Sequence, residues 1–244
     1  MKEETVLYKS ADTTCRGFLA YDPTKTAKSP AVIVIHAWRG LDDFSKQKAR
    51  MLAELGYVGF SADLYGAGAT ATTDDKAYEL MSPLFVDRKL LRERMVSAYE
   101  TIKAMPFVDA NRIGAIGFCF GGLSAIELFR SGVDLRGVVS FHALMGTTIG
   151  DLQAQAIPST PSTKSSILML HGHDDPYVSR QDIENITKEF TEAKVDWQMH
   201  LYSHTSHAFT NPQANDPTGA LKYNPLSDQR SWLEMTNFFE EVFK

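Results

Sequence analysis

Short runs of β-branched and other apolar residues alternate along this chain with longer segments of helical repeat, and this alternation constrains the fold most. The run AVIVI at Ala31–Ile35 is apolar at every position, as expected for a strand covered on both faces. Further strands of this kind are predicted at Tyr57–Leu64, Arg112–Phe118, Arg136–His142 and Ser165–Gly172. Such strands, separated by helices, predict an α/β fold with a mostly parallel central sheet and helices on both faces.

Four segments carry apolar residues at helical spacing, at 46–56, 88–105, 123–132 and 229–243. The first ends at Gly56, a residue type that commonly follows the last turn of a helix. Val195–Tyr202 alternates apolar and polar residues, which predicts a strand nearer the edge of the sheet. Two polar stretches rich in proline and glycine, 145–164 and 211–228, predict loops long enough to be lids or surface arms.

Composition limits the partners and the compartment. The 244 residues have a formal net charge of −5, which gives no electrostatic reason to expect a nucleic acid or an anionic membrane as partner. No repeat or composition shift divides the chain, so we expect residues 1–244 to form one domain. The amino-terminal residues lack the apolar stretch of a secretory signal, and the only cysteines are Cys15 and Cys119. These features favour a reducing, cytoplasmic location.

The hexapeptide GFCFGG lies between a predicted strand and a predicted helix and has Cys119 at its centre. It matches the G-x-nucleophile-x-G elbow with cysteine in place of the usual serine. The turn is sharp, so side chains at the glycine positions would collide with the flanking elements. It also places the sulfur at a helix N-terminus, where the dipole and the free N–H groups favour a thiolate. Taken alone, the motif equally fits a buried structural cysteine or a dinucleotide-type glycine turn.

Two later loops supply an acid and a base in the order that elbow-containing hydrolases require. The first, GHDDPYV, carries Asp174 and Asp175, and the second, SHTSHAF, carries His207. Both follow predicted strands, and strand ends are where α/β sheets gather their functional residues. Three loops in this order favour a catalytic role for Cys119 over a structural one.

Through these motifs the chain resembles the dienelactone hydrolases, a family with the α/β-hydrolase fold. The resemblance extends over nearly the whole chain, through VIVIHAWRGL, GYVGFSADLYG, GFCFGG, the HGxxDxxV turn, SHAF and a tail with TNP, YN and DxxSW. It implies Cys119 as nucleophile, Asp175 as acid and His207 as base. It also implies an oxyanion hole formed by the backbone N–H groups of Trp38 and Phe120.

The chain departs from the family pattern at two positions. The family has a glutamate that contacts the resting thiol where this chain has Ala37, so the control exerted by that glutamate does not carry over. We predict instead a resting thiolate–imidazolium pair between Cys119 and His207. The family's archetype binds a substrate carboxylate with an arginine where this chain has Asn211. Arg39 is either a replacement cation beside the nucleophile or a solvated surface residue.

We expect three residues near the nucleophile to contact the substrate: His36, Arg39 and Phe118. His36 also fits, like His142, a hydrogen-bonded position in the core or at its rim. The histidines of the two later loops lack the spacing of a zinc site, so no metal is expected. The chemistry needs no cofactor.

The sequence therefore predicts a hydrolase that cleaves an ester or lactone of a small molecule. The Cys119 thiolate would form a thioester, which water activated by His207 would then hydrolyse. The same residues could instead transfer acyl groups or hydrolyse thioesters. A non-catalytic scaffold that binds a small molecule is a further alternative, favoured only by the alanine at position 37.

Overall fold

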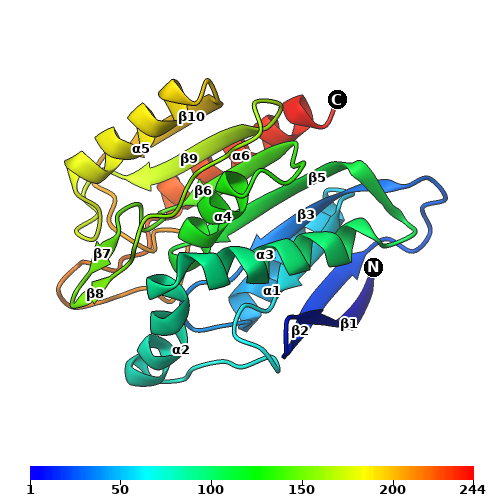
Figure 1. The fold of residues 1–244 in the computed structure, drawn as a ribbon, viewed down its shortest axis with the longest axis horizontal. Helices are drawn as coiled ribbons and strands as arrows, with labels where there is room; N and C mark the ends of the chain where they lie inside the picture. The colour runs from blue at the N-terminus through cyan, green and yellow to red at the C-terminus, as the bar shows by residue number, and fades with distance from the viewer.

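A computed structural model describes residues 1–244 and has an eight-stranded sheet at its centre, in the order β1-β2-β4-β3-β5-β6-β9-β10 (Figure 1). The strands are β1 (Lys2–Ser10), β2 (Thr13–Tyr21), β3 (Ser29–Ile35), β4 (Val58–Ala62), β5 (Val108–Phe118), β6 (Gly137–Phe141), β9 (Ser166–Gly172) and β10 (Asp196–Tyr202). From β4 to β10 every neighbouring pair is parallel, whereas β1 and β2 are antiparallel. The predicted α/β class is confirmed.

Helices cover both faces of the sheet. The helices are α1 (Asp43–Glu54), α2 (Asp74–Val86), α3 (Arg88–Lys103), α4 (Phe120–Arg130), α5 (Arg180–Glu192) and α6 (Pro225–Val242). In Figure 1, α3, α4 and α5 lie in front of the sheet, and α1 and α6 lie behind it. No helix has the length and apolar character needed to cross a membrane.

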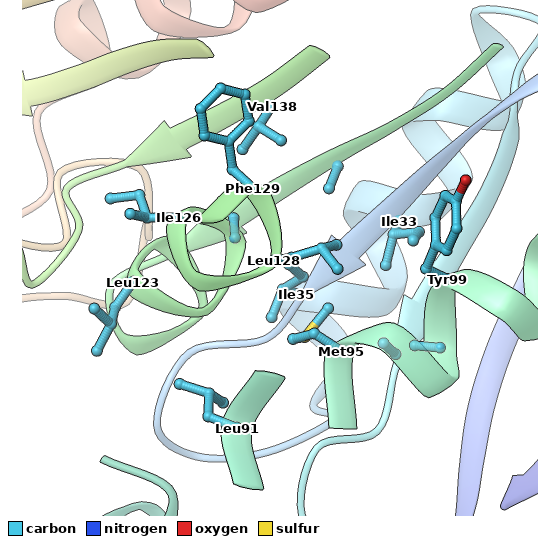
Figure 2. Close-up of a cluster of buried hydrophobic side chains, with 14 of the residues drawn as sticks. Ile33, Ile35, Leu91, Met95, Tyr99, Leu123, Ile126, Leu128, Phe129 and Val138 are labelled. Carbon is cyan, nitrogen blue, oxygen red and sulfur yellow. The ribbon is translucent and has the colours of Figure 1, made fainter. Parts of the chain in front are cut away.

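The two sides of β3 belong to different cores, because successive side chains of a strand point to opposite faces. Ile33 and Ile35 join the larger core under α3 and α4, where Figure 2 shows Ile33 near Tyr99 and Ile35 near Leu128 and Met95. Val32 and Val34 join the smaller core, which α1 and α6 cover. The apolar run of β3 is therefore explained by burial on both faces.

Five parallel strands and the edge strand β10 lie close to their predicted positions, whereas several other elements were missed. The amino-terminal hairpin of β1 and β2 is paired along its full length, although β1 is exposed at most positions. Helices α2 and α5 were not predicted. The stretch 145–164 contains a small hairpin, β7 (Thr148–Ile149) with β8 (Leu152–Gln153), and α6 already begins at Pro225 within the second predicted loop.

The carboxyl ends of the parallel strands meet at one edge of the sheet, the edge toward β7 and β8 in Figure 1. The residues that follow β3, β5, β6, β9 and β10 therefore gather there. This is the edge where ligand sites of α/β sheets lie.

Candidate active site

Cys119 forms a sharp turn between β5 and α4. Its φ is 58° and its ψ is −118°, a combination that side-chain-bearing residues rarely adopt. The flanking glycines make the turn possible. A Cβ on Gly117 would lie 2.0 Å from the carbonyl oxygen of Gly121, and a Cβ on Gly121 would lie 2.2 Å from that of Ile35. The glycines of GFCFGG are thus required by close backbone contacts.

His142 holds the backbone of this turn. The N–H of Cys119 donates to the carbonyl oxygen of Phe141 and to Nδ1 of His142, both at 3.1 Å. Nε2 of His142 lies 2.8 Å from the hydroxyl of Thr210. Burial, and next the charge of His207, hold the pKa of His142 well below its usual range. The ring is therefore neutral, with Nδ1 accepting and Nε2–H donating to Thr210. Nothing in the sequence separated this histidine from others at strand ends.

His207 and Asp175 form a buried pair. Nδ1 of His207 lies 2.7 Å from Oδ2 of Asp175, and Oδ1 of that carboxylate accepts from the N–H of Tyr177 at 2.9 Å. Nε2 of His207 is buried and makes no hydrogen bond, yet Cys119 is close enough to be its main electrostatic partner. Burial lowers the pKa of His207, but Cys119 and Asp175 together raise it to about 10. This favours an imidazolium at His207.

The neighbouring Asp174 points away from this pair. Its carboxylate accepts from Nδ1 of the exposed His173 at 2.8 Å, rather than from its own backbone as a turn residue would. His171 is buried, and its Nε2 lies 4.0 Å from Oδ2 of Asp175. Burial lowers the pKa of His171 to about 4, so its ring is neutral at physiological pH. The structure thus brings Asp175, and not Asp174, to His207.

Two backbone segments near the nucleophile carry the expected oxyanion donors. Phe120 is the first residue of α4, so its N–H has no acceptor within the helix. Trp38 follows β3 and lines the same cleft as Cys119, and its carbonyl oxygen accepts from the hydroxyl of Tyr65 at 2.7 Å, which holds the peptide after Trp38 in place. The Tyr65 ring stacks on Phe120 with 6.4 Å between the ring centroids. One aromatic ring therefore contacts both segments that carry the expected oxyanion donors.

A cleft of about 840 Å³ opens over these groups. Cys119, His142 and His207 line its base, and Trp38 and Ala37 line one wall. Half of the other lining residues come from the segment after His207, which includes Asn211. The predicted loop 211–228 is thus a wall of the cleft.

The three expected substrate contacts differ in where they lie. Phe118 lines the cleft, although its ring is nearly covered by Phe141 at a centroid distance of 4.7 Å. Arg39 lies at the rim, where its guanidinium forms an ion pair with Asp74. His36 is fully buried and outside the cleft, so the expectation for this residue is wrong.

Both ring nitrogens of His36 form hydrogen bonds with the backbone of this chain. Nδ1 lies 2.7 Å from the carbonyl oxygen of Ala37, and Nε2 accepts from the N–H of Leu64 at 3.2 Å. This pattern requires a neutral ring, in agreement with burial lowering the pKa of His36. His36 therefore joins the ends of β3 and β4 and has no free ring nitrogen for a substrate.

Lys48 of α1 lies beneath the cleft, nearly buried among aromatic rings. Its Nζ is 4.7 Å from the ring centre of Trp232, 5.1 Å from that of Phe44 and 5.7 Å from that of Phe118. Asp228 lies 3.9 Å from the same ammonium group. The DxxSW tail thus joins α6 to α1 directly under Phe118, a role that the sequence did not indicate.

Comparison with known proteins gives a consistent result. The sequence model of the dienelactone hydrolase family matches residues 16–243. A carboxymethylenebutenolidase of Pseudomonas putida is 23% identical over 223 residues, 88% of this chain and 89% of the relative.

Two solved structures are similar over 100% of this chain and 99% of their own length, each with a TM-score of 0.89. One, named m3DLH, is 36% identical. The other is 32% identical and is named a dienelactone hydrolase-like promiscuous phosphotriesterase from metagenomic libraries.

Proposed function

This chain belongs to the dienelactone hydrolase family, whose members are lactone hydrolases, and we propose that it hydrolyses a small-molecule ester or lactone through Cys119, His207 and Asp175. One observation carries the proposal: the buried Nε2 of His207 has no hydrogen-bond partner and lies in the same cleft as Cys119, while Nδ1 binds Asp175. A base with one nitrogen held and the other free beside a nucleophile is the arrangement that acyl transfer requires.

The reaction begins with attack of the Cys119 sulfur on the ester carbonyl carbon. Its oxygen becomes an oxyanion, to which the N–H groups of Phe120 and Trp38 donate. As the intermediate collapses, the carbon–oxygen bond breaks and the imidazolium of His207 gives its Nε2 proton to the leaving alkoxide or enolate. Water, deprotonated by His207, then attacks the thioester and releases the acid. Asp175 keeps the His207 ring oriented and stabilises its positive form.

The nucleophile limits the substrates. A thiolate is a good leaving group itself, so the intermediate returns to substrate unless the departing oxygen is also a good leaving group. Enol-lactones and aryl esters meet this condition, whereas peptide bonds do not. Neutral phosphotriesters are a second candidate, since a similar structure is named a promiscuous phosphotriesterase. Hydrolysis of thioesters, or acyl transfer to another nucleophile, would use the same residues.

Trapping of the acyl-enzyme tests the proposal. Brief reaction with a 4-nitrophenyl ester should add the acyl mass to the peptide that contains Cys119, as measured by mass spectrometry after an acid quench. Cys119→Ala should lose both the adduct and the turnover. Cys15→Ala is the matched control, because Cys15 is fully buried in the core and should not affect either signal. Turnover retained in Cys119→Ala would refute the proposed function.

A further inference from the structure

The charged groups that face the cleft are mostly carboxylates. Those of Asp42, Asp43, Asp74 and Asp216 line it, against a single guanidinium, that of Arg39. Arg39 is paired with Asp74, so its charge is locally compensated. The position where a cation would be expected from the family resemblance is held by the neutral Asn211, which also lines the cleft.

The groups near the other three carboxylates, those of Asp42, Asp43 and Asp216, offset the excess negative charge of the cleft only in part. Asp42 accepts from the N–H of Ser45 at 3.0 Å and so lies at the positive end of α1. The side chain of Asp43 is fully exposed and lies 3.7 Å from the ammonium of Lys46, and the charge of Arg50 also acts on it. Hydrogen bonds from the side chain and backbone of Thr218 lower the pKa of Asp216, which keeps this carboxylate ionised at neutral pH.

No other cation compensates at the base of the cleft. The imidazolium of His207 is balanced by the carboxylate of Asp175, 2.7 Å from its Nδ1, and the His142 ring is neutral. Lys48 does not line the cleft, because its ammonium is enclosed below Phe118 beside Asp228. The cleft is therefore negative at its rim and close to neutral at its base.

The charge of the rim reaches a side chain beside His207. The ring of Tyr177 lies 5.1 Å from that of His207, in an edge-to-face arrangement. The pKa of Tyr177 is raised, first by burial and next by the charge of Asp216, with smaller contributions from Cys119, Asp175 and Asp74. The phenol of Tyr177, beside the catalytic histidine, is thus affected by the charges of both rim carboxylates, Asp216 and Asp74.

We propose that this cleft selects uncharged or cationic esters and lactones and discriminates against anionic ones. This inference rests on the proposed function for the reaction and adds the substrate class. Clefts lined by one sign of charge concentrate ligands of opposite sign, with effects of about 10- to 1,000-fold on association. Dienelactones are themselves carboxylates, so the preferred substrates would differ from the family's namesake.

The first experiment compares three 4-nitrophenyl esters of similar length, whose acyl chains end in a methyl, a carboxylate or a trimethylammonium group. At low ionic strength the cationic ester should have a kcat/KM at least about ten-fold above that of the anionic one. The difference should shrink with added salt, because exposed charges are screened. An anionic ester cleaved as well as the cationic one at low salt would overturn the inference.

Replacing single aspartates by asparagine shows which carboxylates cause the preference for cationic over anionic esters. Asp216→Asn retains the oxygen that accepts from the N–H of Thr218, and it should reduce the cationic-to-anionic ratio by about two- to five-fold. Asp196→Asn removes the same charge at the start of β10, where the side chain is exposed and outside the cleft, and should leave the ratio unchanged. Equal effects of the two variants would show that overall charge, and not the rim, sets the preference.

A second experiment needs no turnover. Methanethiosulfonate reagents bearing trimethylammonium or sulfonate groups transfer their thiol portion to Cys119, forming a disulfide and releasing methanesulfinate. The ratio of the cationic to the anionic rate should fall in Asp216→Asn and not in Asp196→Asn. If no ester is cleaved while this ratio behaves as expected, the proposed function fails and the charge selectivity stands. An unchanged ratio in Asp216→Asn overturns the selectivity.

Discussion

Asp175→Asn tests how much the reaction depends on the buried carboxylate. The change keeps the shape of the side chain but removes its charge, and the pair it disrupts is well isolated from water: His207 is 1% exposed and Asp175 is 6% exposed. The hydrogen bond between Nδ1 and Oδ2 measures 2.7 Å. Because both atoms are buried, no water can replace the lost carboxylate without rearrangement of the loop.

The magnitude follows from two contributions. A hydrogen bond to a charged group is worth about 1.5–3 kcal/mol, which is roughly 10- to 150-fold in rate if it strengthens in the transition state. An asparagine can also turn its amide N–H toward Nδ1 and so stabilise the tautomer that carries its proton on Nε2. In that tautomer Nε2 cannot accept a proton from the nucleophile or from water. Together these effects predict a loss of about 10²- to 10⁴-fold in kcat/KM.

Initial rates with a neutral aryl ester, measured against pH, provide the assay. The activity lost in Asp175→Asn should come with a lower pKa of His207, since the hydrogen bond that His207 donates to Asp175 is one of the contributions that raise it. Asp174→Asn is the matched control, and it should change kcat/KM by less than about two-fold because Asp174 contacts only the exposed His173. A larger effect from Asp174→Asn than from Asp175→Asn would refute the assignment of the acid.

Three further changes test other parts of the site. Cys119→Ala should abolish hydrolysis while the protein stays folded, and it should lower the pKa of His207 seen by NMR, because the thiolate that raises it is removed; an unchanged pKa would contradict the thiolate–imidazolium pair. Gly121→Ala should prevent folding or lower the unfolding free energy by at least about 3 kcal/mol, since its Cβ would lie 2.2 Å from the carbonyl oxygen of Ile35; wild-type denaturation midpoints would refute this. Ala37→Glu adds a carboxylate to the cleft and should slow alkylation of Cys119 by iodoacetamide at neutral pH, because a nearby anion disfavours the thiolate; unchanged or faster alkylation would refute this effect of position 37.

The parallel core of the fold was predictable because burial on both faces leaves a direct trace in the sequence. The AVIVI run of β3 and the elbow GFCFGG each encode a local requirement, apolar faces in one and close backbone contact in the other. The hairpin of β1 and β2 left no such trace. Its outer strand is mostly exposed, so its residues carry little burial pattern although their backbone is fully paired.

The positions of site residues were predictable where a motif encoded them and not where the fold alone brings residues together. The pairing of Asp175 with His207 follows from the place of Asp175 in the HGxxDxxV turn. His142 and Tyr177 become neighbours of His207 only through packing of separate loops, at centroid distances of 5.2 and 5.1 Å. His36 was misjudged because a histidine at a strand end can face the cleft or the interior, and only the neighbouring N–H of Leu64 decides which.

Helix α6 follows in the chain every strand that it covers, and this order has a consequence for how the protein is made. The smaller core joins Val32 and Ile116 of the sheet to Met235 and Phe239 of α6. During synthesis the amino-terminal parts of a chain emerge from the ribosome first. The sheet face that α6 covers thus stays partly exposed until α6 is released. Until then Lys48 also lacks its contact with Trp232. A chain stopped before α6 would present an apolar sheet face to other chains, so a nascent chain needs protection from aggregation until α6 has been released.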